Sequence, residues 1–125
     1  NEFPQERYLI NKEITGIINR ITEFNVTDTF CGFKAYKVEK LKLMHLTEYG
    51  YGMPLQLWIQ AWKLGLRVRE IPVKLIYKDL LKQFKGTLKN PVTRLNYYKN
   101  IIEKEITNTV QNDIEIRKTR KKMIL

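Results

Sequence analysis

Gly50-Tyr51-Gly52-Met53-Pro54-Leu55-Gln56-Leu57-Trp58 opens the most apolar part of the chain. The two glycines make a flexible entry, and Pro54 suits the first position of a helix, where its missing N–H has no partner to lose. Four residues then fall on one helical face and are expected to pack inward: Leu55, Trp58, Ile59 and Trp62. Gly65 follows as a C-terminal stop. The stretch therefore predicts a buried, amphipathic helix.

Two further helices are predicted on either side of this one. Residues 8 to 24 carry an apolar stripe made of Ile10, Ile14, Ile17, Ile18, Ile21 and Phe24. Asn90-Pro91 is a typical helix start, with a capping side chain followed by a first-turn proline. The helix that it opens has its own stripe at Leu95, Tyr98, Ile102 and Ile106.

Strands are predicted between the helices. Phe33 to Lys37 alternates as a short strand does, and Val38 to Leu46 reads as a short helix. Arg67 to Tyr77 reads as a strand with one apolar face, and Pro72 places it at an edge or at a kink. Few strands among amphipathic helices predict an α/β class, here an α+β fragment.

Length and charge limit the function classes. The 125 residues fit one small domain, which we place at 1–111, followed by a basic tail at 112–125. The net charge of +10 favours an anionic partner or a merely solvated basic surface. Cys31 is the only cysteine, which excludes an intrachain disulfide and indicates a reducing, cytoplasmic setting. Because the chain begins at Asn1 in mid-pattern, we expect it to be part of a longer protein.

Metal and nucleophile motifs were sought and are weak. His45 stands alone in the sequence, and no Cys, His or carboxylate cluster has ligand spacing. Cys31 is interpreted as a packed thiol, because it follows a polar turn and has no His partner. No glycine-rich phosphate loop of the P-loop or Rossmann type is present. The sequence therefore predicts no metal site and leaves the catalytic residues unknown.

Several short segments remain, each of them weak evidence alone. They are Asp28-Thr29-Phe30-Cys31-Gly32-Phe33-Lys34, the Gly50–Trp58 stretch, Glu70-Ile71-Pro72-Val73, Lys82-Gln83-Phe84-Lys85-Gly86, Asn90-Pro91 and Arg94-Leu95-Asn96-Tyr97-Tyr98. In this order and spacing they resemble family-two glycosyltransferases, in the branch of dolichyl-phosphate and polyprenyl-phosphate sugar transferases. The resemblance covers about residues 17 to 105. Gln56 stands where the family has Glu, and Lys82 stands where it has Arg.

This resemblance implies the C-terminal, acceptor-side part of a nucleotide-diphospho-sugar transferase (GT-A) fold. The implied activity moves a sugar from a nucleotide sugar to a polyprenyl (dolichyl-type) phosphate. The full-length enzyme is expected to use Mg²⁺ or Mn²⁺. No Asp-x-Asp motif occurs in this sequence. We therefore expect no cofactor in this chain and no activity from the fragment alone.

The resemblance also names candidate residues. On the acceptor or substrate side they are Asp28, Cys31, Gly32, Lys34 and Gln56, and in a phosphate-contacting loop they are Lys82, Gln83 and Lys85. A phosphate monoester has its second pKa near 6, so a phosphate acceptor needs little help from a base and tolerates Gln56. Gln56 either orients a substrate by hydrogen bonds or is a polar helix residue with no special role. The loop either closes over the leaving diphosphate or is a solvated basic loop.

Other partners and functions remain open at this stage. The basic tail either touches an anionic membrane surface, which would make the protein peripheral at the cytoplasmic face, or is a disordered end. A face left by a missing half would allow a homodimer. A non-catalytic interaction domain is the main alternative function. A nucleic-acid-binding module is less favoured, because the lysines fall in one loop and the tail and no reader motif occurs.

Overall fold

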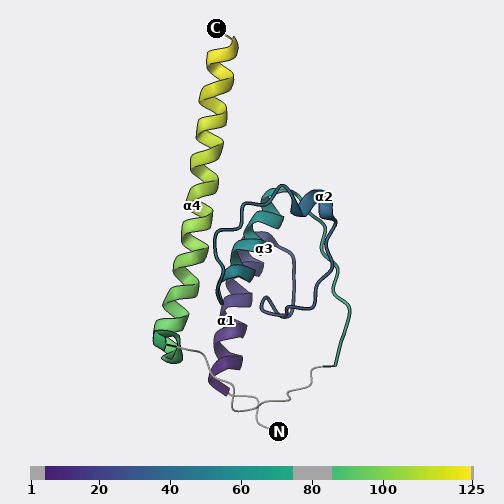
Figure 1. Cartoon of the computed structure of the whole chain (residues 1–125), viewed down its shortest axis with the longest axis vertical. Coiled ribbons are helices and arrows are strands. Elements are labelled where there is room, and N and C mark those ends of the chain that lie inside the picture. Colours follow the sequence, from purple (N-terminus) through teal and green to yellow (C-terminus); the bar gives the residue numbers. More distant parts are fainter. Residues whose placement is uncertain (1–4, 75–85, 125) are drawn as a thin grey trace.

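The computed structural model describes residues 5–74 and 86–124, with 109–124 described as helical backbone (Figure 1). Its elements, in chain order, are α1 (Gln5–Thr22), α2 (Val38–Leu41), α3 (Met53–Lys63), the 3-10 helix η1 (Gly86–Lys89) and α4 (Pro91–Ile124). The three longer helices pack on one another. In Figure 1, α2 lies on the side remote from α4, whereas the segment between α2 and α3 returns along the side that faces α4.

The core lies where α1, α3 and α4 meet. The apolar stripes predicted for these helices supply most of it: Ile10, Ile14 and Ile18 from α1, Leu55, Trp58 and Ile59 from α3, and Tyr98 and Ile102 from α4. Ile101 of α4, which the predicted stripe does not include, is also part of the core. Ile14, Ile18, Leu55 and Ile59 are fully buried. The prediction of three amphipathic helices is therefore confirmed, with bounds shifted by a few residues.

The end of α1 is set by the backbone and by Asn19. Glu23 and Asn25 both have positive φ angles, 60° and 58°, which end the helix. The Asn19 side chain then holds the loop, because its Oδ1 accepts from the Val26 N–H at 3.0 Å and its Nδ2 donates to the Val26 carbonyl at 2.8 Å. This contact directs the chain back over α1 and toward α3.

Helix α3 begins at Met53, one residue before the predicted position, and ends at the predicted glycine. Gly52 is its N-cap, and Pro54 lies in the first turn. Gly65 has a φ of +67°, and two hydrogen bonds close the end: Gly65 N–H to Trp62 O and Leu66 N–H to Ala61 O, both 3.0 Å. The prediction that Trp62 packs inward is wrong, since this side chain is 39% exposed.

Helix α4 begins at the predicted cap. The Thr93 N–H donates to Asn90 Oδ1 at 3.0 Å, and Pro91 is the first helical residue. The helix then continues to Ile124, through the boundary between domain and tail that was placed at residue 111. Figure 1 shows the C-terminal part of α4 extending well beyond the other elements.

The α/β prediction is wrong, and with it the GT-A fold. The described parts of the chain, 5–74 and 86–124, contain no strand and no sheet, and this mostly helical arrangement does not fit a GT-A sandwich. Phe33 to Lys37 and residues 67–74 form no regular element, and the rest of the expected Arg67–Tyr77 strand lies outside the described residues. Ile71 is 77% exposed and Val73 is 57% exposed, so the apolar face expected there is not buried. Alternation of apolar and polar residues is not sufficient to predict a strand, because a strand also needs a neighbouring strand to form its ladder of hydrogen bonds.

Candidate functional site

The turn at residues 28–34 is fixed by local and long-range hydrogen bonds. Asp28 Oδ1 accepts from the Phe30 N–H at 2.8 Å, so the Asp28 side chain closes a local turn. The Thr29 hydroxyl lies 2.9 Å from that of Thr15 on α1. The Trp58 indole N–H on α3 donates to the Thr29 carbonyl at 2.9 Å. Two helices therefore hold this turn in place.

Lys34 ends the turn above Trp58. Its Nζ lies 5.3 Å from the centre of the Trp58 ring, which is a cation–π distance. Burial lowers the pKa of the Lys34 ammonium, while the charges of Cys31 and Asp28 act in the opposite direction. The structure thus brings together three residues predicted from the motif, Asp28, Cys31 and Lys34, around a partly desolvated cation.

Gly32, two residues before Lys34, has open space at its Cβ position. A Cβ built at Gly32 would meet no atom within 4 Å, and the residue is exposed. Its φ lies outside the left-handed range, so the glycine is not required by the backbone conformation. The open space at Gly32 would therefore allow the close approach of another group. Cys31 is half-buried at the same turn.

Segments that carry the family resemblance meet one another in the fold. The Phe30 and Tyr98 rings lie 4.8 Å apart, joining the first motif to the last. Gly52 lies against α4 so closely that a Cβ there would come within 1.9 Å of Ile101 Cδ1. Glu70 Oε1 accepts from the Thr27 N–H at 2.6 Å and from its hydroxyl at 3.1 Å. Several of the motif residues therefore serve to pack these segments against one another.

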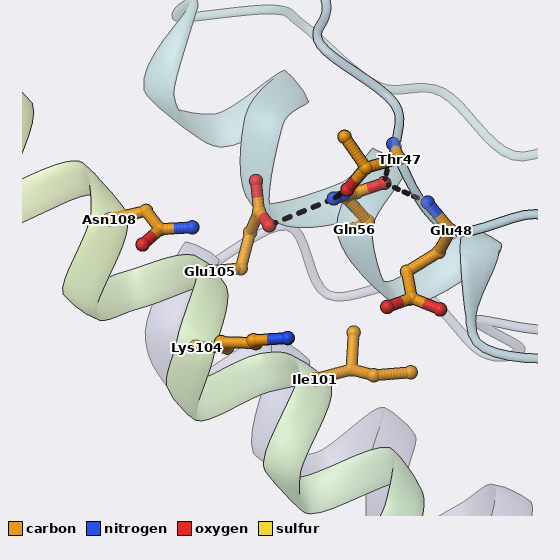
Figure 2. Close-up of a pocket in the computed structure, with 7 residues that line it drawn as sticks. All are labelled: Thr47, Glu48, Gln56, Ile101, Lys104, Glu105 and Asn108. Carbon is orange, nitrogen blue, oxygen red and sulfur yellow. Dashed lines mark hydrogen bonds between the residues drawn. The ribbon is translucent and has the colours of Figure 1, made fainter.

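Gln56 is engaged in internal hydrogen bonds (Figure 2). Its Oε1 accepts from the backbone N–H groups of Thr47 and Glu48, at 2.8 and 3.0 Å. Its Nε2 donates to Thr47 Oγ1 at 2.9 Å and to Glu105 Oε2 at 3.1 Å. Both amide protons and two acceptor positions are thus occupied. Gln56 positions the loop before α3, and a substrate would have to displace these bonds to reach it.

Glu105 is a functional group that the sequence reasoning missed. It is only 6% exposed, and its second oxygen accepts from Gln60 Nε2 at 2.8 Å. Gln60 in turn accepts from the His45 N–H at 2.6 Å and donates to the His45 carbonyl at 2.8 Å. One buried carboxylate on α4 therefore joins two glutamines of α3. A signal existed, because Glu105 continues the inward-facing register of Tyr98, Ile101 and Ile102.

A small polar pocket opens beside this network (Figure 2). Its volume is about 70 Å³, and it is lined by Thr47, Glu48, Gln56, Ile101, Lys104, Glu105 and Asn108. Ligand sites for drug-sized molecules span roughly 300–1,000 Å³, so a nucleotide sugar does not fit here. Tyr97 reaches toward the rim, with its hydroxyl 3.4 Å from Glu48 Oε2. Burial, and then the Glu48 charge, raises the pKa of Tyr97.

No protein-family model matches the chain, and neither does a curated protein or a solved structure. The resemblance to family-two glycosyltransferases therefore rests on the quoted motifs alone.

The remaining predicted groups have no described counterpart. The loop candidates Lys82, Gln83 and Lys85 lie outside the described residues. Within the described ranges, no group of three His, Cys, Asp or Glu side chains could hold a metal ion, so the Mg²⁺ or Mn²⁺ implied by the resemblance does not fit there. A helix able to cross a bilayer is also not found in this part of the chain. The candidate site is accordingly the turn at 28–34 with Trp58.

Proposed function

We propose that this chain is the acceptor-side part of a glycosyltransferase that moves a sugar from a nucleotide sugar to a polyprenyl phosphate. The proposal does not depend on the GT-A fold, which the described chain lacks. The observation that carries it is the turn at 28–34, where Lys34 lies over Trp58 and the exposed Gly32 has open space at its Cβ position. Both residues belong to motifs of the resemblance, and other motif segments pack around the same turn.

Lys34 is proposed to hold the phosphate of the lipid acceptor. A partly desolvated ammonium gains more from an incoming anion than a fully hydrated one does, because water screens it less. Trp58 lies under the Lys34 ammonium, so this group is partly positioned before an anion binds. The charge of Asp28 acts on the same ammonium and favours its charged form. The exposed Gly32 backbone leaves room for the phosphate oxygens.

The reaction asks for little proton transfer from this part of the protein. One phosphate oxygen of the acceptor attacks the anomeric carbon, the bond from that carbon to the nucleoside diphosphate breaks, and the diphosphate leaves with the bonding electrons. The attacking phosphate is largely ionised at neutral pH, so no base has to take a proton from it. The structural use of Gln56 fits this chemistry, because a glutamine that holds a loop does not have to act as a base.

The proposed site of action is the cytoplasmic face of a membrane. A polyprenyl phosphate is embedded in the bilayer by its chain, so its phosphate lies at the lipid headgroup level. The net charge of +10 favours such an anionic surface. Peripheral attachment is therefore part of the proposal.

The direct test is product formation by the complete gene product that contains this chain. It is incubated in detergent with a polyprenyl phosphate, a divalent cation and a panel of radiolabelled nucleotide sugars. We expect label to move into the organic phase as a lipid-linked sugar with at least one donor. Labelled lipid that depends on the added polyprenyl phosphate supports the proposal. Absence of labelled lipid with every donor, from a protein shown to be folded, contradicts it.

A further inference from the structure

The segment from Phe33 to Leu43 exposes apolar side chains among lysines. Phe33 is 84% exposed, Val38 63% and Leu43 62%. Lys37, Lys40 and Lys42 alternate with them and are exposed as well. Charged residues in this segment are four lysines and one glutamate, a net of +3. No other side chain of the described core covers these apolar groups, since none of them belongs to the hydrophobic cluster.

Neighbouring chain extends this surface. The segment at 66–74 also exposes Ile71, at 77%, and Val73, at 57%. Glu70 ties this segment to Thr27, just before the turn at 28–34. In Figure 1 both α2 and residues 66–74 lie on the side remote from α4. A shallow hollow on α2, lined by Lys37, Val38, Glu39, Lys42 and Leu43, is part of the same basic and apolar surface.

We propose that this surface, formed by residues 33–43 with 71–73 at its margin, docks the protein onto an anionic lipid bilayer. The exposed apolar side chains would enter the boundary between headgroups and acyl chains. The lysines between them would lie among the lipid phosphates, as the basic residues of interfacial amphipathic segments do. The apolar side chains would determine how deeply the protein inserts into the bilayer, and the lysines would make binding selective for anionic lipids.

The composition of the surface favours lipid over other anionic or apolar partners. A nucleic acid would satisfy the lysines but would leave Phe33, Val38 and Leu43 against a charged phosphate backbone. The centre of a protein–protein interface is usually depleted of lysine, whereas here three exposed lysines lie between the apolar groups. An interleaved pattern of long basic and apolar side chains instead fits the layered chemistry of a bilayer surface.

Docking in this orientation has a consequence for Lys34. Phe33 directly precedes Lys34 in the sequence, so insertion of Phe33 into the membrane surface would place the Lys34 ammonium at the headgroup level. A lipid phosphate would then reach Lys34 without leaving the bilayer. This last link rests on the proposed function, whereas the docking itself rests on the exposed residues alone.

The test is co-sedimentation of the 125-residue protein with vesicles that contain no polyprenyl phosphate. Vesicles of phosphatidylcholine are compared with vesicles in which part of it is replaced by phosphatidylglycerol. Two variants probe the surface: a lysine variant with Lys37→Gln, Lys40→Gln and Lys42→Gln, and an apolar variant with Phe33→Ser, Val38→Ser and Leu43→Ser. A matched control removes the same charge elsewhere, at Lys12→Gln, Lys89→Gln and Lys99→Gln. A tail variant changes Arg117, Lys118, Arg120, Lys121 and Lys122 to Gln.

We expect binding to the anionic vesicles only. Each lysine near such a surface contributes about fivefold to the partition coefficient, so the lysine variant should lose about 100-fold. The apolar variant should lose at least tenfold, while the matched control loses clearly less than the lysine variant. Because all six positions are exposed, circular dichroism should show that both variants keep their helical content.

Three results would overturn the proposal. One is an equal loss of vesicle binding in the matched control, which would show that binding depends on net charge alone and not on this surface. Another is loss of binding in the tail variant alone, with the two surface variants unaffected. The third is tighter binding to duplex DNA than to anionic vesicles at the same salt, lost in the lysine variant. Sugar transfer in detergent needs no bilayer, so a failure of docking would leave the proposed function standing and the two can be told apart.

Discussion

Replacing Glu105 by glutamine should destabilise the protein although it changes one atom. The Glu105 carboxylate is 6% exposed and accepts from two amide groups, Gln56 Nε2 at 3.1 Å and Gln60 Nε2 at 2.8 Å. A glutamine at the same place offers one acceptor oxygen and one NH₂ group. It can keep one of these bonds, but its NH₂ then faces the NH₂ of the other glutamine.

The cost follows from what is lost. A hydrogen bond to a charged acceptor is worth about 1.5–3 kcal/mol, and a buried donor without an acceptor adds a penalty of similar size. Rearrangement toward the small pocket recovers part of this, so we expect a net loss of about 2 kcal/mol in the free energy of unfolding. With a urea dependence of about 2 kcal/mol per molar, the midpoint should fall by about 1 M.

The assay is urea unfolding of the 125-residue protein followed by circular dichroism at the helix band. Glu103→Gln is the matched control, because it removes the same charge from an exposed position of the same helix. The control should stay within about 0.5 kcal/mol of the parent protein. If Glu105→Gln is as mild as Glu103→Gln, the buried network does not hold α3 to α4 and the reasoning fails.

Three further predictions concern single contacts. Gly52→Ala should lower the free energy of unfolding by about 1–3 kcal/mol, because the new Cβ overpacks against Ile101. Gly50→Ala is the control for urea unfolding and should be nearly neutral, because its Cβ would meet nothing closer than 3.7 Å. Equal effects of the two substitutions would contradict the close approach of Gly52 to α4. Burial raises the pKa of Tyr98 to about 12, above its unfolded value near 10, so the folded state holds this proton longer. The stability that this proton contributes, about 2–3 kcal/mol, is fully present below about pH 10 and is lost as the pH rises toward about 12. A Tyr98→Phe variant should not show this loss, and the same fall in unfolding free energy above about pH 10 in that variant would refute the prediction. Arg94→Met should cost about 1–3 kcal/mol, because Arg94 is 2% exposed and donates to Glu6 at 2.8 Å, and a loss under about 0.5 kcal/mol would show that the pair contributes little.

The helices could be read from the sequence because their signals are local. The Asn90 cap, the proline after it and the glycine at the end of α3 act on their own backbone, and the structure uses them as predicted. The side-chain turn of Asp28 is local in the same sense. The spacing of the apolar residues on α1, α3 and α4 also fixed which faces would meet in the core.

The failures lie where the outcome depends on distant groups. Alternation at 33–37 and 67–74 predicted strands, but a strand exists only if another strand pairs with it, and the described ranges hold none. For Gln56 the sequence leaves a substrate-orienting residue and a polar helix residue as alternatives, because its hydrogen bond to Glu105, 49 residues further on, is not visible in the sequence. The spacing predicts Trp62 in the core, yet among the described residues its side chain is left 39% exposed.

The role of Lys34 as the acceptor phosphate site is tested by the dependence of sugar transfer on this residue. Initial rates are measured with the complete gene product at varied polyprenyl phosphate, for Lys34→Gln, Lys34→Arg and the control Lys12→Gln, which removes a lysine from the exposed face of α1. The account predicts that Lys34→Gln raises the KM for the lipid phosphate about tenfold or more, that Lys34→Arg restores much of it, and that Lys12→Gln and the KM for the nucleotide sugar are unchanged. An unchanged KM for the lipid in a folded Lys34→Gln protein would contradict the assignment of this turn as the acceptor phosphate site.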